Sequence, residues 1–69
     1  MKGVDIMNRI EKLRKKKGMS YSEIAEKAGV TYQYIYLLAK NKRTNPSLET
    51  MRKVAHALDE KVETVFQIN

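Results

Sequence analysis

The segment from 32 to 37 holds four side chains that are unusual for a merely solvated helix surface: Tyr32, Gln33, Tyr36 and Leu37. At about 100° per residue, they fall on one side of a helix whose opposite side carries Ile35 and Leu38. Glutamine can pair bidentately with adenine N6 and N7, and apolar groups can pack on thymine methyl groups. The segment therefore predicts a helix that reads base edges in the major groove of DNA.

The same side chains also have simpler explanations. Tyr32 and Tyr36 would suit self-association, and Leu37 would suit packing at the rim of the core. Tyr34 lies on the flank of the helix next to Leu38, so we expect it to be half-buried in the core. Groove contact must therefore be weighed against packing for each of these residues.

The net charge indicates an anionic partner. Fourteen Lys and Arg against eight Asp and Glu give a formal charge of +6, which favours nucleic acid and, second, a membrane surface. Lys42 and Arg43 lie just beyond the helix expected at about 32–40, so we predict that they contact phosphates. The cations at 14–17 suit the negative end of the first expected helix, and a solvated helix end is the simpler explanation for the lysines among them.

Composition excludes several kinds of site. The chain has no cysteine and one histidine, so we expect no disulfide, no metal site and no cofactor. No nucleophile, base and orienting group occur together in a motif, so we expect no enzyme. No apolar stretch approaches the ~20 residues of a membrane span, and the first residues lack the apolar core of a signal peptide. We expect one soluble, cytoplasmic domain over 1–69.

Apolar spacing predicts five helices and no sheet. The expected helices cover about 5–17, 20–28, 32–40, 47–58 and 62–66, with a polar loop at 41–46. Ile6, Ile10 and Leu13 mark the inner face of the first helix at i, i+4 and i+7. The inner face of the fourth helix is expected to carry Leu48, Met51, Val54, Ala55 and Leu58. No window alternates with period two, so the predicted fold class is all-α.

The second and third helices, over 21–40, have the spacing of a helix-turn-helix. Ser20 and Glu23 form a capping box at the start of the second helix. Ala25 is a small residue where two crossing helices would touch, and Gly29 supplies the left-handed turn. Thr31 caps the third helix. In a helix-turn-helix, this third helix enters the major groove of DNA.

Four stretches resemble the phage Cro/CI repressor family, the Xre-type helix-turn-helix regulators: IEKLR (10–14), KGMS (17–20), EIAEKAGV (23–30) and NPSLET (45–50). The resemblance covers about residues 6–66, nearly the whole chain. It implies a compact five-helix, lambda-repressor-like domain that binds a pseudo-palindromic operator as a two-fold dimer.

The resemblance also implies roles for individual residues. Base edges are read by the four residues named first above. The phosphate backbone is held by Ser20, Tyr21, Lys40, Lys42 and Arg43, and we expect a phosphate contact from Thr31 as well. More apolar surface than one short terminal helix can bury is offered by Val62, Val65, Phe66 and Ile68. We therefore expect a homodimer contact at this end, weak in solution and formed chiefly on DNA.

Three departures from the family pattern bear on these expectations. The family usually has glutamate where this chain has Ala39, so Arg14 loses its usual partner and should turn to phosphate or to another acid such as Glu49. Asn41 replaces a glycine after the third helix, as the next-best residue for a left-handed turn. Glu60 replaces a commonly apolar residue before the last helix, which weakens that helix.

These observations predict a sequence-specific transcriptional regulator that binds double-stranded DNA, with family analogy favouring repression over activation. An interaction adaptor or antitoxin-type partner protein on the same fold is the alternative. A third reading is binding of single-stranded nucleic acid by tyrosine stacking. An unidentified protein partner is compatible with each. Steep weakening of binding by salt would separate a DNA contact from a protein contact.

Overall fold

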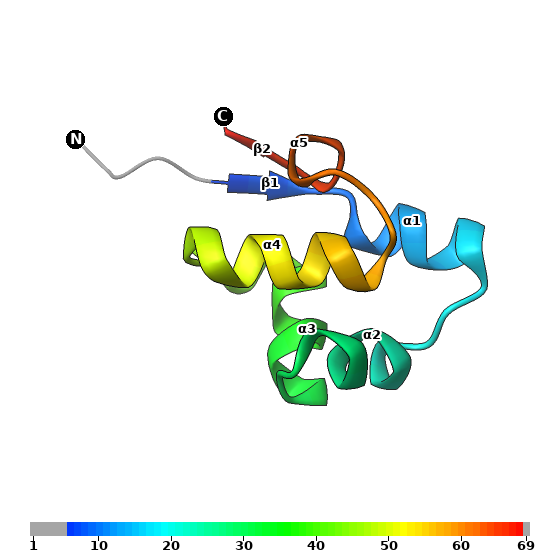
Figure 1. The fold of residues 1–69 in the computed structure, drawn as a ribbon. Coiled ribbons are helices and arrows are strands. Elements are labelled where there is room, and N and C mark those ends of the chain that lie inside the picture. The colour runs from blue at the N-terminus through cyan, green and yellow to red at the C-terminus, as the bar shows by residue number, and fades with distance from the viewer. Residues whose placement is uncertain (1–5, 69) are drawn as a thin grey trace.

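The computed structural model describes residues 6–68, which form five helices and one short sheet (Figure 1). The helices are α1 (Ile10–Lys17), α2 (Tyr21–Ala28), α3 (Tyr32–Ala39), α4 (Leu48–Ala57) and α5 (Val62–Val65), and the strands are β1 (Ile6–Asn8) and β2 (Phe66–Ile68). The predicted five-helix fold is confirmed. Within the described range, no helix combines the length and apolar character needed to cross a membrane.

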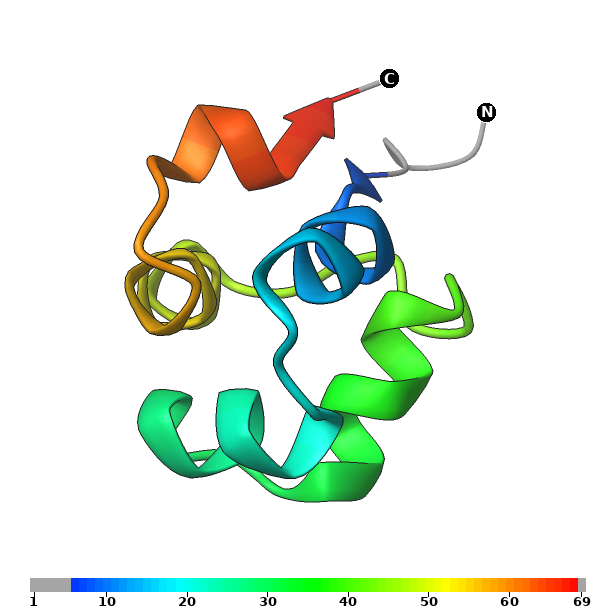
Figure 2. The same ribbon diagram turned by 90° about the vertical axis from the view of Figure 1, so that its right-hand side faces the viewer.

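The sheet is an element that the sequence analysis missed. Strands β1 and β2 pair antiparallel, with Ile6 opposite Ile68 and Asn8 opposite Phe66, and Figure 2 shows them side by side near α1. Helix α1 therefore begins at Ile10 and not near residue 5. Three-residue strands are too short to show alternation, and Ile6 also fits the helical spacing of the residues after it.

The predicted capping residues do begin the helices. The Ser20 hydroxyl oxygen accepts the Glu23 backbone N–H at 3.0 Å, and the Glu23 carboxylate accepts the Ser20 N–H at 2.8 Å. Thr31 and Ser47 each accept a backbone N–H three residues further along the chain. Gly29 ends α2 with φ 72° and ψ 32°, the left-handed conformation that glycine adopts without strain.

The core forms between the inner faces of these helices. The largest fully buried side chains are Ile10, Ile24, Ile35, Leu38, Leu58, Val54 and Val65. Burial of one such side chain stabilises the fold by about 1.5–3 kcal/mol. Leu48 was expected on the inner face of α4, and that prediction is wrong, because the residue opens the first turn of the helix and is 53% exposed.

The C-terminal end of the chain is part of this core. Val65 and Phe66 are 0% and 5% exposed, because α5 packs on α4 and β2 pairs with β1. The expectation that the monomer leaves these two side chains as surplus apolar surface for a dimer is therefore wrong. Val62 is half-buried, and the side chain of Ile68 lies outside the described part of the structure.

Candidate nucleic-acid interface

The turn after α2 places α3 with one face in the core and one face in solvent. Ala25 is 4% exposed, and α2 and α3 pack together. On α3, Ile35 and Leu38 are 0% and 1% exposed, whereas Tyr32 and Tyr36 are 52% and 40% exposed. The predicted division of this helix into an inner and an outer face is confirmed. Both views show α2 and α3 on the side of the molecule away from the sheet (Figures 1 and 2).

The other side chains of α3 follow the same division. Gln33 is exposed beside Tyr32, and Leu37 is half-buried at the rim. Tyr34 is half-buried and packs against the core, as expected. The Arg43 guanidinium lies 5.3 Å from the centre of the Tyr34 ring, within the range of a cation–π contact.

Three tyrosines from two helices meet on this face, and we call them the tyrosine cluster: Tyr21, Tyr32 and Tyr36. The rings of Tyr32 and Tyr36 are nearly parallel, with centroids 6.3 Å apart and planes 8° apart. Tyr21 from α2 packs edge-on to both, at 5.9 Å and 86° to Tyr32 and at 5.5 Å and 80° to Tyr36. Edge-to-face pairs of this kind contribute about 0.5–1.5 kcal/mol beyond burial.

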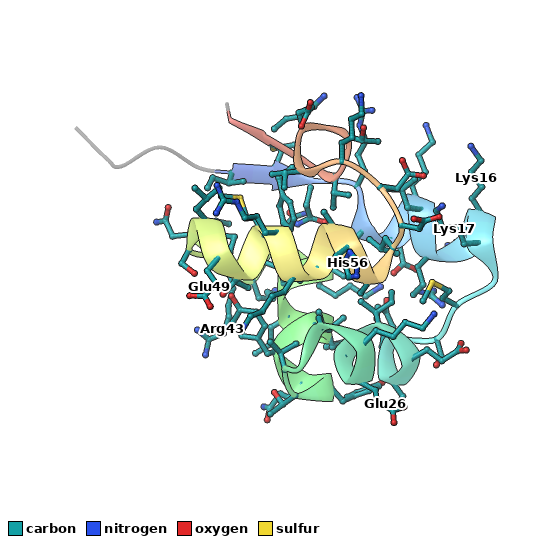
Figure 3. The ribbon with its side chains drawn as sticks, viewed as in Figure 1. Lys16, Lys17, Glu26, Arg43, Glu49 and His56 are labelled. Carbon is teal, nitrogen blue, oxygen red and sulfur yellow. The ribbon has the colours of Figure 1, made fainter. Side chains whose placement is uncertain are left out.

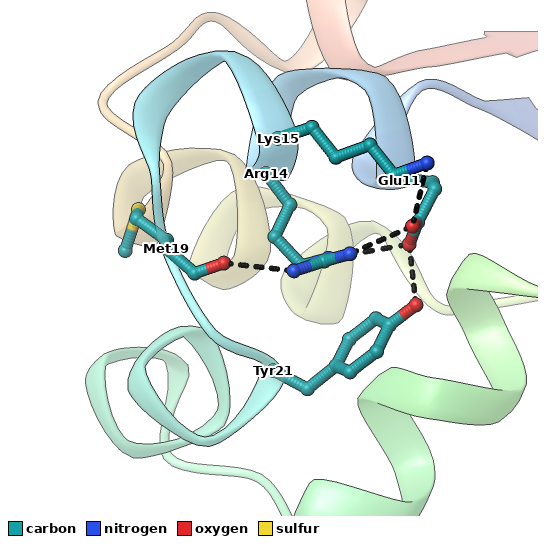
Figure 4. Close-up of polar contacts among 5 residues, drawn as sticks. All are labelled: Glu11, Arg14, Lys15, Met19 and Tyr21. Atoms are coloured by element: carbon teal, nitrogen blue, oxygen red, sulfur yellow. Dashed lines mark hydrogen bonds and ion pairs between the residues drawn. The ribbon is translucent and has the colours of Figure 1, made fainter.

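The carboxylate of Glu11 connects this cluster to α1 (Figure 4). It accepts a hydrogen bond from the Tyr21 hydroxyl and two from Arg14, at 2.7 Å from Nη2 and 3.2 Å from Nε. Arg14 Nη1 also donates to the Met19 carbonyl at 3.1 Å, and the guanidinium lies 4.4 Å from the centre of the Tyr21 ring. Hydrogen bonds from Arg14, which has the larger effect, and from Tyr21 stabilise the charged carboxylate and lower the pKa of Glu11 to about 2.

These contacts bear on the expected roles of Arg14 and Tyr21. Arg14 has an acidic partner, as expected, but that partner is Glu11 on its own helix and not Glu49. The hydrogen bond to Glu11 also raises the pKa of Tyr21 above its ordinary value. Because a phenol has one proton to donate, the Tyr21 hydroxyl cannot donate to a phosphate while it donates to Glu11.

The predicted phosphate-contacting side chains lie around α3. Lys40, Lys42 and Arg43 are exposed at its C-terminal end, and none forms an ion pair with an acid among residues 6–68. Figure 3 shows Arg43 at the opposite side of the view from Lys16 and Lys17. Lys17 is paired with an acid, Glu60, at 2.9 Å.

Ser20 and Thr31 stand at the starts of α2 and α3, and both are exposed. Their hydroxyl oxygens already accept a backbone N–H as N-caps. Each hydroxyl proton stays available to donate to an anion. Their contact with phosphate remains a prediction.

Asn8, which the sequence analysis did not single out, fixes the end of α3. Its Nδ2 donates to the Leu38 carbonyl at 2.8 Å and to Asn41 Oδ1 at 3.3 Å, while its Oδ1 accepts the Ile10 N–H at 3.0 Å. Asn41 has φ 61°, the left-handed conformation predicted for it. An asparagine just before a helix is a visible signal of a cap, but its contact with Leu38, 30 residues away, is not.

Comparison with known proteins identifies the family. The helix-turn-helix model HTH_3 matches residues 10–65. The HTH-type transcriptional regulator SinR of Bacillus subtilis is 47% identical over 61 residues, which cover 88% of this chain and 55% of that protein. The chain therefore spans about half the length of this relative.

Solved structures agree with this assignment. The crystal structure of SinR, described as the master regulator for biofilm formation, in complex with DNA has a TM-score of 0.75 and 48% identity, over 81% of this chain and 89% of that one. A complex of SinR and SinI has a TM-score of 0.74 and 48% identity, over 81% and 54%. The chain therefore belongs to the Xre-type (Cro/CI-like) helix-turn-helix family of DNA-binding transcriptional regulators.

Proposed function

We propose that this domain is a sequence-specific repressor that places the outer face of α3 in the major groove of double-stranded DNA. The observation that carries the proposal is the exposure of Tyr32 and Tyr36, 52% and 40%, beside the exposed Gln33. Large aromatic surfaces left in water on one helix face are typical of a binding site. Exposed cations at the end of the same helix would hold the phosphates on either side of the groove.

Base reading is expected to be concentrated in Gln33. Selection from a pool of random duplexes would give the preferred site, and affinities for that site and for a random duplex would then be compared. Gln33→Ala should cost about 1–3 kcal/mol on the preferred site and relax one or two positions. Gln67→Ala is the matched control, because Gln67 is exposed on β2. Equal weakening of both duplexes by Gln33→Ala would contradict the assignment of α3.

We further propose that two copies bind a pseudo-palindromic operator as a homodimer. A domain this small reads too few base pairs to select one site among the many competing sites of a genome. Two-fold pairing would place both copies of α3 in successive major grooves, about 34 Å apart. The half-buried Val62 and the outer edge of β2 support a contact at the end away from α3. Such a small surface favours pairing chiefly on DNA.

The spacing of half-sites tests the dimer. The expected operator is an inverted repeat whose half-site centres lie about 10 base pairs apart. Five inserted base pairs would move the two half-sites to opposite faces of the duplex and should abolish cooperative binding in a titration. Unchanged affinity for the spaced operator would leave a monomeric binder.

A protein partner is a further proposal, supported by the similar structure in which SinR is found with SinI. Salt separates this kind of contact from DNA binding. Log affinity for DNA falls linearly with log salt concentration, and each phosphate contact should make this decline, the salt slope, steeper by about 0.9. A flat salt dependence would favour a protein contact on the tyrosine cluster.

A further inference from the structure

We propose that Tyr21 is a positioning residue that holds the base-reading tyrosines in place and does not contact phosphate. The proposal rests on the proposed function, in which Tyr32 and Tyr36 enter the major groove. Tyr21 lies on α2 and packs edge-on to both of these rings, at 5.9 Å and 5.5 Å. The Tyr21 ring therefore restrains two side chains of α3 that would rotate in solvent if only their own helix contacted them.

Tyr21 can provide this support because its own ring is fixed on two sides. Its hydroxyl donates to Glu11, which lies on α1. The Arg14 guanidinium covers the ring at 4.4 Å and is itself held by Glu11 and by the Met19 carbonyl. Figure 4 shows the ring between the ribbons of α1 and α3. The side chain cannot change its χ1 rotamer without breaking the bond between its hydroxyl and Glu11.

The fixed cluster has a consequence for affinity. Immobilising a side chain during association weakens binding by roughly 2- to 12-fold per side chain. Tyr32 and Tyr36, stacked on each other and supported by Tyr21, are already ordered before DNA arrives. The preorganised pair should therefore raise affinity for the preferred sequence, which contacts both rings, more than affinity for a random duplex, which contacts neither.

The electrostatics at Tyr21 argue against a phosphate contact. The Glu11 carboxylate already accepts the phenol proton, and an anionic phosphate could replace it only by breaking that bond. Arg14 at 2.7 Å and Lys15 at 3.7 Å neutralise Glu11, so its charge does not oppose the approach of DNA. The phosphate contacts are left to the cations that follow α3.

Two substitutions separate support from phosphate binding. Tyr21→Phe keeps the ring and loses the hydroxyl, whereas Tyr21→Leu removes the ring. Affinity for the selected operator and for a random duplex would be measured at several salt concentrations. Tyr21→Phe should change neither affinity by more than about threefold, and Tyr21→Leu should weaken operator binding about tenfold with the random duplex and the salt slope unchanged.

A double substitution and a measurement on the unaltered chain complete the test. In a Tyr32→Ala, Tyr36→Ala background, Tyr21→Leu should cause no further loss of operator affinity. In the free, unaltered protein, NMR should show contacts between the Tyr21 and Tyr36 rings and one χ1 rotamer for each outer tyrosine. This measurement does not depend on whether a variant folds.

Several results would overturn the proposal. Equal weakening of both duplexes by Tyr21→Phe would make Tyr21 a phosphate contact. Full operator affinity in a folded Tyr21→Leu variant, or rotamer averaging of Tyr32 and Tyr36 in the free protein, would remove the positioning role. If the unaltered chain prefers no sequence at all, the proposed function fails instead, and the rotamers still report on the cluster.

Discussion

Replacement of Asn8 by alanine should destabilise the domain strongly, although Asn8 lies in a strand of only three residues. The Asn8 side chain accepts the Ile10 N–H at the start of α1 and donates to the Leu38 carbonyl at the end of α3. Arg9 occupies the N-cap of α1 but makes no side-chain capping bond. Asn8 therefore serves two helix ends at once, and no other side chain among the described residues replaces it at α1.

The expected magnitude follows from these two bonds. Loss of a capping side chain costs about 1 kcal/mol, and loss of one further hydrogen bond costs about 1 kcal/mol. The bond to Asn41 at 3.3 Å is exposed, so it adds little. Asn8→Ala should then lower the free energy of unfolding by about 2 kcal/mol, which corresponds to roughly 8–16 °C in Tm for a domain of this size.

Chemical and thermal unfolding followed by circular dichroism would measure the loss. Asn45→Ala is the matched control, because Asn45 is exposed in the loop before α4, and it should change stability by less than about 0.5 kcal/mol. Asn8→Asp keeps the acceptor for α1 and loses the donor to α3, so it should retain the cap alone. Equal stability of the Asn8→Ala and Asn45→Ala variants would show that the Asn8 side chain stabilises neither helix end.

Three further outcomes are expected. Lys42→Gln should weaken binding to all duplexes alike and lower the salt slope by about one unit, and a loss confined to the preferred sequence would instead make Lys42 a base reader. The pKa of Glu11, lowered to about 2, should appear in an NMR titration of its carboxyl carbon. The stability that Glu11 contributes is present above pH 4.5 and is lost as the pH falls towards 2, so a midpoint near 4.5 would contradict the bond to Arg14. Ala39→Glu should destabilise the fold by about 1–3 kcal/mol, because position 39 is 6% exposed and Arg14 is already engaged, and unchanged unfolding would show that Arg14 can change partners.

The features that could be predicted from the sequence have local causes. Ser20 and Glu23 are three residues apart and form their capping box without help from the rest of the fold. The two faces of α3 follow from helical periodicity alone, so Ile35 was placed in the core and Tyr32 outside it. Gly29 takes its left-handed conformation because it lacks a Cβ.

The features that could not be predicted depend on pairs of distant residues. Pairing of β1 with β2 joins the two ends of the described chain, and neither strand is long enough to show a pattern. Because this pairing was not predicted, Val65 and Phe66 were wrongly expected to be surplus apolar surface. In a strand, alternate side chains face opposite sides, so Phe66 turns into the core while Gln67 stays exposed.

The position of the acid that pairs with Arg14 determines how α3 is held. In the family that this chain resembles, an arginine aligned with Arg14 pairs with a glutamate aligned with Ala39. That ion pair would join α1 directly to α3. Here the acid is Glu11, three residues from Arg14 on the same helix, so the ion pair alone cannot hold α3. The link passes instead through the Tyr21 hydroxyl to the rings of the tyrosine cluster, and at the other end of α3 through Asn8. Aromatic contacts lack the charge of an ion pair, so this link should persist in salt that weakens phosphate contacts. Base preference should then survive at salt concentrations where total affinity has already fallen.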